Sequence, residues 1–126
     1  QIRSMMDHPS RLQLLHFLFG VAKADGIVLE SEVIIINKIA TYLGINPSDF
    51  ESIKAMFYED IDSAYRILEI RSTVSDQEIK KAYRKMAKKY HPDKVAHLGT
   101  EHQKGAEEKF KKVQEAYILI KKRRGL

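Results

Sequence analysis

Hydrophobic residues recur along this chain at intervals of three and four positions, which places them on one face of an α-helix. The pattern is found in several segments that are separated by short polar or glycine-containing stretches. No segment shows the alternation of β-branched and polar residues that is typical of a half-buried strand. The sequence therefore predicts an all-α protein.

Three helices are expected in the first half of the chain, at residues 10–24, 30–43 and 47–58. Each carries apolar residues at helical spacing that we expect to face the core. These residues are Leu14, Phe17, Leu18, Val21 and Ala22 in the first helix, Val33, Ile36, Ile39, Ala40 and Leu43 in the second, and Phe50, Ile53, Met56 and Phe57 in the third.

Residues at the ends of these helices favour the same boundaries. Asp7 stands just before a proline and is suited to start the first helix, and Gly44 can end the second in a left-handed conformation. Asn46 is a typical cap for the third helix. Ile34 and Ile35 widen the apolar surface of the second helix, so we expect it to be buried on more than one side.

The second half of the chain predicts a short helix after a junction at 59–62, and two longer helices at 75–90 and 105–123. The longer helices are expected to form an antiparallel hairpin with the short helix across it. The loop between them should run to about Lys104, and the tail KKRRG should fray. The residues expected in the core are Tyr65, Ile67, Leu68, Ile79, Ala82, Tyr83, Met86, Ala87, Tyr90, Ala106, Phe110, Val113, Ala116, Tyr117 and Ile120.

The helix at 75–90 has the clearest signals at both ends. Ser75 and Glu78 match a capping box, in which the serine accepts from the Glu78 amide and the glutamate reaches back. Pro92 stops the helix because proline disfavours helical geometry at the residue before it, His91. Most remaining positions of the helix are basic, namely Lys80, Lys81, Arg84, Lys85, Lys88 and Lys89.

Charge divides the chain into two unequal halves. Residues 1–61 contain five basic and eight acidic side chains, whereas residues 62–126 contain 17 basic and nine acidic ones. This contrast indicates two modules, which we place at 1–58 and 62–126. A strongly basic module favours an acidic partner, whether nucleic acid, an anionic membrane surface or an acidic protein face.

Composition excludes several classes of protein. The chain has no cysteine, which rules out disulfides and cysteine-based zinc sites. It has no run of eighteen or more apolar residues, so no membrane-spanning helix is expected, and no signal-peptide pattern is present.

The tripeptide His91-Pro92-Asp93 is the main candidate for a functional site. A histidine donor and acceptor, a stiff proline and a carboxylate follow directly after the basic helix. Such a polar tip is suited to docking on another protein. It does not suit catalysis, because no nucleophile or second carboxylate stands at a spacing that would form a reactive pair. We therefore expect neither enzymatic activity nor a cofactor.

The segments AYRILEI, SDQEIKKAYRKMAKKYHPDKV and EEKFKKVQEAYILI resemble the J domain of DnaJ-type co-chaperones over residues 62–123. The resemblance implies binding to a DnaK-type, seventy-kilodalton heat-shock chaperone and stimulation of its ATP hydrolysis. It implies that His91, Pro92 and Asp93 are the trigger. It also implies that the basic face meets an acidic surface of the partner, through Lys80, Lys81, Arg84, Lys85, Lys88 and Lys89. The segment between Asp93 and Phe110 is longer than in the commonest J domains.

The first half resembles the later part of a TerB-like helical domain. The resemblance rests on an ADGxVxxxE pattern formed by Ala24, Asp25, Gly26, Val28 and Glu32. A TerB-like module before a J domain is the arrangement of DjlA-type, membrane-anchored DnaJ-like proteins. This arrangement implies a cytoplasmic location, with a membrane tether only through a segment upstream of this chain. The sequence does not predict the oligomeric state.

The sequence also allows other interpretations. The basic half could bind nucleic acid instead of a protein, although the resemblance implies no nucleic acid partner. Asp25 and Glu32 could ligate a divalent cation, or could serve only as a turn residue and a helix-starting acid. His97 and His102 are close enough in sequence to form a metal pair, but no other residue supports one. A scaffold role for the first half is a third possibility.

Overall fold

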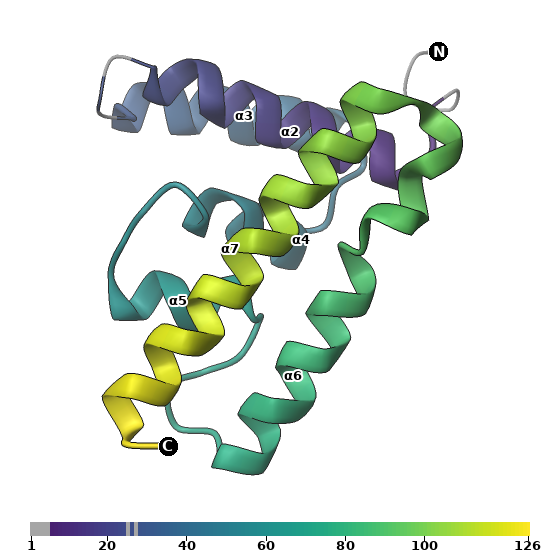
Figure 1. Cartoon of the computed structure of the whole chain (residues 1–126). Coiled ribbons are helices and arrows are strands. Elements are labelled where there is room, and N and C mark those ends of the chain that lie inside the picture. The colour runs from purple at the N-terminus through teal and green to yellow at the C-terminus, as the bar shows by residue number, and fades with distance from the viewer. Residues whose placement is uncertain (1–5, 25, 27) are drawn as a thin grey trace.

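The computed structural model describes residues 6–24, 26 and 28–126, and over these residues it is helical without strands (Figure 1). The elements are α2 (His8–Lys23), α3 (Glu30–Tyr42), α4 (Pro47–Ala55), α5 (Ile61–Ile67), α6 (Asp76–Lys89), the 3₁₀ helix η1 (Pro92–Leu98) and α7 (Thr100–Arg124). The expected all-α class is confirmed.

Four helix starts follow directly from capping side chains. The carboxylate of Asp7 accepts from the Ser10 amide at 2.9 Å, and that of Asp60 accepts from the Ser63 amide at 2.7 Å. The Asn46 side chain accepts from the Asp49 amide at 2.8 Å. Ser75 accepts from the Glu78 amide at 3.2 Å, but Glu78 returns to the serine hydroxyl at 3.3 Å and not to its backbone. These caps satisfy amides that the helix itself leaves without partners.

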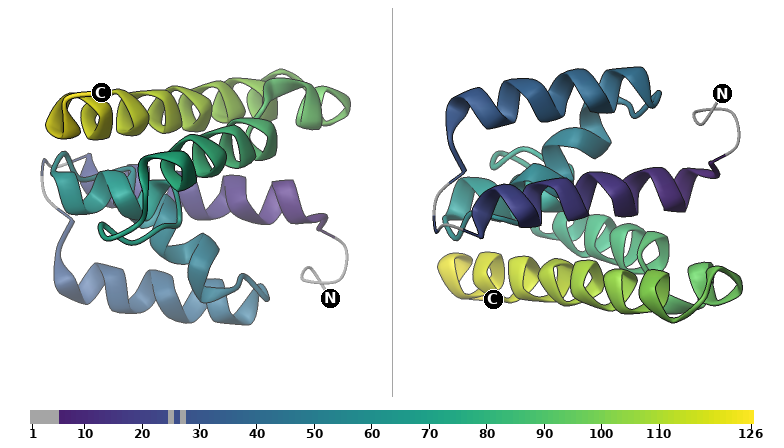
Figure 2. Two further views of the ribbon diagram at one scale, coloured as in Figure 1. Left: turned by 90° about the horizontal axis from the view of Figure 1, so that it is seen from below. Right: turned by 90° about the horizontal axis from the view of Figure 1, so that it is seen from above.

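The α6 and α7 helices form the expected antiparallel hairpin, and α5 packs across α7 (Figure 1). The α2 and α3 helices lie at the end of the hairpin where η1 joins α6 to α7, and α4 packs between α2 and α5. In both views of Figure 2, α2 lies between α3 and α7. The predicted modules therefore pack against each other directly, with α2 and α4 forming most of the contact from the first half.

A single hydrophobic core continues through both halves. In the first half, Phe19 packs against Phe50 and Phe57 with ring centroids 5.6 and 5.7 Å apart. In the second half, Ile79, Met86, Val113 and Ile120 are almost completely buried. These residues belong to the same cluster, joined through α4 and α5.

The expected core face of the first helix is partly wrong. The buried residues of α2 are Leu12, Leu15 and Phe19, whereas Phe17 and Val21 are 60% and 57% exposed. The helix is apolar on most of its circumference, so periodicity alone fits more than one stripe. Its position between α3 and α7 selects the stripe that is buried.

The expectation that α3 is buried on more than one side is also wrong. Ile34 and Ile35 are 52% and 57% exposed. The main packing partner of α3 is α2, and α3 lies at the outer edge of the molecule, so its far side faces solvent (Figure 2). Gly44 has a φ of 77°, which confirms the expected left-handed end of this helix.

The long segment after Asp93 is more regular than expected. Instead of a loop to about residue 104, the chain forms η1 and then starts α7 at Thr100. Gly99 joins the two with a φ of 98°, a conformation that side chains rarely adopt. The α7 helix continues to Arg124, so the basic tail is helical and not frayed.

Candidate functional site

The tripeptide lies where α6 ends and η1 begins. His91 has φ −61° and ψ 133°, the extended geometry imposed by the following proline, and Pro92 is the first residue of η1. The side chains of His91 and Asp93 are 51% and 86% exposed. The histidine and the carboxylate therefore face solvent at the end of the helix.

Local contacts orient the His91 ring. Its Nδ1 accepts a hydrogen bond from the Asp93 amide at 3.2 Å, and its carbonyl accepts from the Lys94 amide at 3.0 Å. The ring stands edge-on against Phe110 of α7 at 5.7 Å. Because Nδ1 accepts, the proton of the neutral ring lies on Nε2. The tripeptide can thus present an N–H donor and a carboxylate acceptor to a partner.

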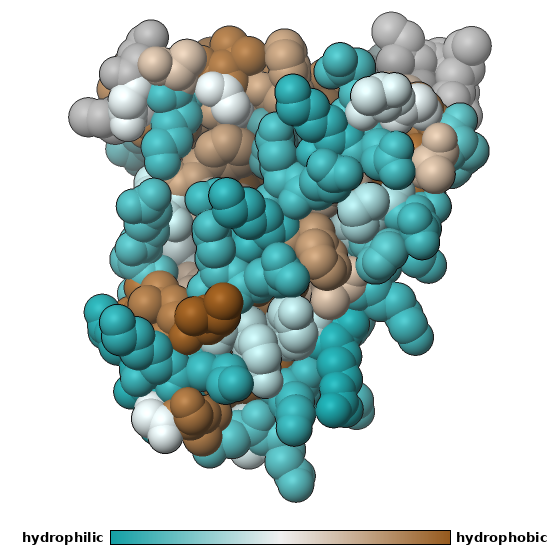
Figure 3. Space-filling model, viewed as in Figure 1, coloured by the Kyte–Doolittle hydropathy of each residue, from teal (hydrophilic) through white to brown (hydrophobic). Residues whose placement is uncertain are grey.

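A row of exposed cations follows α6 toward the tripeptide. Five of the six basic residues expected on this face are exposed, namely Lys80, Lys81, Arg84, Lys85 and Lys88. None of the five forms an ion pair with a carboxylate in the described part of the chain. Hydrophilic residues cover the edge of the molecule along α6, whereas hydrophobic ones gather over α2 and α3 (Figure 3). We refer to these five residues as the basic face.

Lys89 does not belong to the basic face, which corrects the expectation from the sequence. Its side chain is 27% exposed, and its ammonium pairs with Asp49 of α4 and with Glu69. The helical rotation between Lys88 and Lys89 turns the second of them toward the first module.

Lys94 is a residue that the sequence reasoning missed. It is exposed, and it lines a shallow hollow together with Arg84, Lys85, Lys88 and Lys89. The hollow therefore extends from α6 onto η1, next to the tripeptide. The position of Lys94 directly after Asp93 was the only sign of this in the sequence. The 3₁₀ helix brings Lys94 back toward α6, and this turn is not evident from the residues alone.

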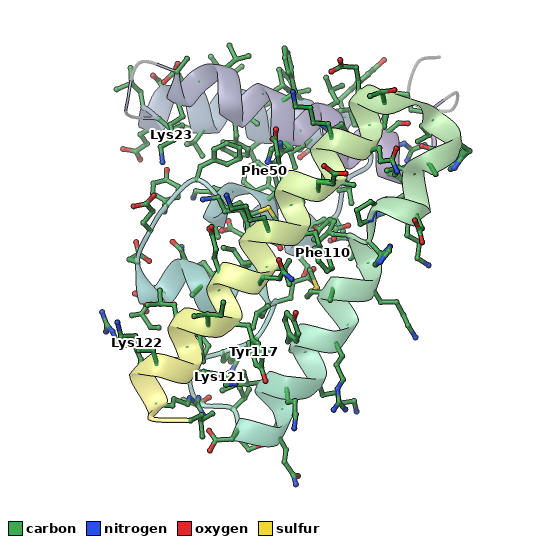
Figure 4. All side chains as sticks on the ribbon, viewed as in Figure 1. Lys23, Phe50, Phe110, Tyr117, Lys121 and Lys122 are labelled. Atoms are coloured by element: carbon green, nitrogen blue, oxygen red, sulfur yellow. The ribbon has the colours of Figure 1, made fainter. Side chains whose placement is uncertain are left out.

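The aromatic residues of the hairpin belong to its interior. Tyr83 and Tyr117 are stacked with centroids 4.2 Å apart and planes 8° from parallel. Phe110 and Tyr117 point from α7 toward α6 (Figure 4). Both are half-buried, in keeping with their expected core role.

Two of the residues considered for metal binding, Glu32 and His97, have other partners. Glu32 accepts a hydrogen bond from the Leu29 amide at 2.8 Å, which is the helix-starting role. Asp25 lies outside the described residues. His97 pairs with Asp7 at 3.8 Å. Within the described residues, no group of three or more histidine or acidic side chains could hold a metal ion.

Comparison with known proteins identifies both halves of the chain. The family model of the DnaJ domain matches residues 63–124. These residues form a J domain. The family model of the tellurite resistance protein TerB matches residues 1–55, so a TerB domain precedes the J domain, as in DjlA-type proteins. In the part of the chain that the structure describes, no helix is long and apolar enough to cross a membrane.

Curated relatives match the J domain closely. Over 56 residues, the chain is 52% identical to the chaperone protein DnaJ of Fusobacterium nucleatum subsp. nucleatum, which covers 44% of this chain and 14% of the relative. Over 64 residues, it is 53% identical to human DnaJ homolog subfamily B member 5, covering 49% of this chain and 17% of the relative. The chain thus spans a small part of the length of these relatives. No solved structure matches it.

Proposed function

We propose that this chain is a co-chaperone whose J domain binds a DnaK-type heat-shock chaperone and stimulates its ATP hydrolysis. The observation that carries the proposal is the position of the exposed His91-Pro92-Asp93 tripeptide at the end of a helix whose outer face is lined by unpaired cations. In this proposal the hydrolytic chemistry belongs to the partner, as the resemblance to DnaJ-type co-chaperones implies.

The basic face would serve encounter and orientation. Exposed cations along one helix attract an acidic surface over several ångströms, and this attraction raises the association rate and weakens with salt. Five such residues on α6, with Lys94 beside them, give the J domain a directional field. The resemblance to DnaJ-type proteins makes an acidic surface of the chaperone the expected target.

The tripeptide would act as the trigger. A binding partner changes the rate of a reaction on another protein only if it favours the reactive conformation over the resting one. The Nε2–H of His91 and the carboxylate of Asp93 are an exposed donor and acceptor two residues apart. Pairing with complementary groups that are aligned only in the hydrolysis-competent chaperone would supply that difference.

A single-turnover ATPase assay with a DnaK-type chaperone tests the proposal. We expect the chain to raise the hydrolysis rate, and His91→Gln or Asp93→Asn to remove the effect without loss of helicity in circular dichroism. His97→Gln and Asp62→Asn are matched controls, because both residues are exposed and lie outside the tripeptide. Full stimulation by either tripeptide variant would reject the assigned site.

A further inference from the structure

A buried carboxylate of the first module holds the end of α6. The side chain of Asp49 is only 3% exposed, and it accepts from two donors, the ammonium of Lys89 and the side-chain amide of Asn46 at 3.1 Å. The Nε2 of His8 lies 3.2 Å from the same carboxylate. Removal of Lys89 would leave this buried carboxylate without its cation, which costs more than the loss of a surface ion pair.

Glu69 is a second acidic residue that pairs with Lys89, and its backbone adopts a left-handed conformation. Its φ is 58°, the one positive value among the described non-glycine residues. Side chains disfavour this conformation, and it persists where surrounding contacts hold it. Here the Glu69 carboxylate accepts from the hydroxyl of Ser48 in α4 and lies 3.3 Å from the Lys89 ammonium. The loop before α6 is therefore tied to the first module at the same point.

This bridge lies at the base of the tripeptide. Only Tyr90, which is 4% exposed, separates Lys89 from His91. Asp49 thus fixes the last turn of α6, from which the tripeptide projects. The five residues of the basic face take no part in the bridge, since none of them pairs with Asp49 or Glu69.

A second contact between the modules supports the His91 ring. Gln13 of α2 accepts from the ammonium of Lys109, a residue of α7 that is 4% exposed. The Gln13 side chain lies over Gly105, where an added Cβ would be 2.1 Å from its Oε1. Lys109 precedes Phe110, and the Phe110 ring is the one that His91 stands against. The backbone and the ring of His91 are therefore both supported by residues that the first module holds.

We propose that the TerB domain positions the His91-Pro92-Asp93 tripeptide, with Asp49 acting through Lys89 as the positioning residue. The inference rests on the proposed function, and it assigns separate tasks to neighbouring residues. The basic face determines how tightly the chaperone is bound, whereas the bridge determines how far a bound J domain accelerates hydrolysis.

The test compares two adjacent lysines in the full chain. Lys88→Gln should raise the chain concentration needed for half-maximal stimulation and leave the maximal rate unchanged. Lys89→Gln should lower the maximal stimulation by about threefold or more, with the half-maximal concentration unchanged within about twofold, because small misplacements of a trigger group are costly. Asp49→Asn should lower the maximal stimulation as Lys89→Gln does. Asp49→Glu, which keeps the carboxylate, should retain most of the maximal stimulation of the wild type. Glu51→Gln, an exposed acid on the same helix, is the control.

Each outcome has a distinct meaning. If the wild-type chain stimulates, His91→Gln does not, and Lys89→Gln equals wild type, the positioning role is overturned while the proposed function stands. An increase in half-maximal concentration alone for Lys89→Gln also overturns it. If neither the wild-type chain nor any variant stimulates ATP hydrolysis, the proposed function fails. The positioning of the tripeptide is then tested by amide NMR spectra. Unchanged His91, Asp93 and Lys94 resonances in Lys89→Gln would then overturn the inference, and shifts absent from Lys88→Gln would support it.

Discussion

Arg124, in the last turn of α7, forms an ion pair with Asp76, in the first turn of α6, at 2.8 Å. Its guanidinium also donates to the Tyr65 hydroxyl at 3.0 Å and to the Ser72 carbonyl at 2.9 Å. The open end of the hairpin is therefore closed by one side chain that reaches α5, α6 and the loop between them. This contact explains why the basic tail stays helical.

We expect Arg124→Ala to lower the melting temperature of the chain and to loosen the end of α7. The substitution removes three hydrogen bonds of a charged donor, which are stronger than neutral ones. Thermal unfolding followed by circular dichroism measures the effect. Arg123→Ala is the matched control, because Arg123 is exposed and its substitution removes no hydrogen bond or ion pair to the described residues. Equal melting temperatures for the two variants would contradict the closing role of Arg124.

Protonation of His16 is expected to destabilise the folded chain. Its ring lies 5.0 Å from that of Phe57, and burial lowers its pKa to about 4, with Lys109 and Lys112 of α7 adding to the shift. Between about pH 6.5 and pH 4 the unfolded chain binds a proton at this residue and the folded chain does not. Stability should therefore fall as the pH drops through this window, by about 3 kcal/mol in total.

Denaturant unfolding between pH 7 and pH 4 checks the prediction on wild type and His16→Gln. The variant should lose most of the additional pH dependence, since glutamine does not titrate. His97→Gln should retain it, because His97 is 64% exposed. The same pH dependence in His16→Gln and wild type would show that other groups cause the acid sensitivity.

The features that the sequence predicted well are local ones. Asp7, Asn46 and Ser75 each cap a helix by accepting from an amide three residues further on. Such a bond depends on the identity and spacing of neighbouring residues, so it can be read without knowing the fold. The end of α6 just before the tripeptide follows in the same way from the geometry that Pro92 imposes on His91.

The features that the sequence did not predict depend on distant neighbours. Lys88 and Lys89 are adjacent residues of the same type, but only Lys89 pairs with a carboxylate that lies 40 residues earlier in the chain. The buried stripe of α2 is likewise chosen by α3 and α7, which lie on either side of it. A helix that is apolar nearly all round gives no local signal for that choice.

Lys109 is predicted to cost stability at neutral pH. Burial lowers the pKa of its ammonium to about 8, and its hydrogen-bond partner is the neutral amide of Gln13. From about pH 8 to pH 10.5 the folded chain releases this proton while the unfolded chain keeps it. Stability should therefore rise with pH across this window, by about 3 kcal/mol.

Lys109→Met should be more stable than wild type at pH 7, by about 1 kcal/mol or more, since an apolar side chain of similar length removes a buried charge. It should also lack the rise above pH 8. Urea unfolding at pH 7 and pH 10 measures both effects, and Lys111→Met provides the control on the exposed side of α7. A destabilised Lys109→Met would mean that the bond to Gln13 outweighs the desolvation of the ammonium.

The basic face is expected to act through its position and not through charge alone. Arg84→Glu and Lys122→Glu change the net charge equally, but Lys122 lies on the side of α7 away from α6 (Figure 4). We expect Arg84→Glu to slow association with a DnaK-type chaperone by about tenfold at low ionic strength and much less at high salt, because screening removes the steering. Lys122→Glu should have little effect in the same surface-binding measurement. If both variants weakened binding equally, and a filter assay showed nucleic acid binding reduced alike by both, general basicity would be the relevant property and a nucleic acid the better partner.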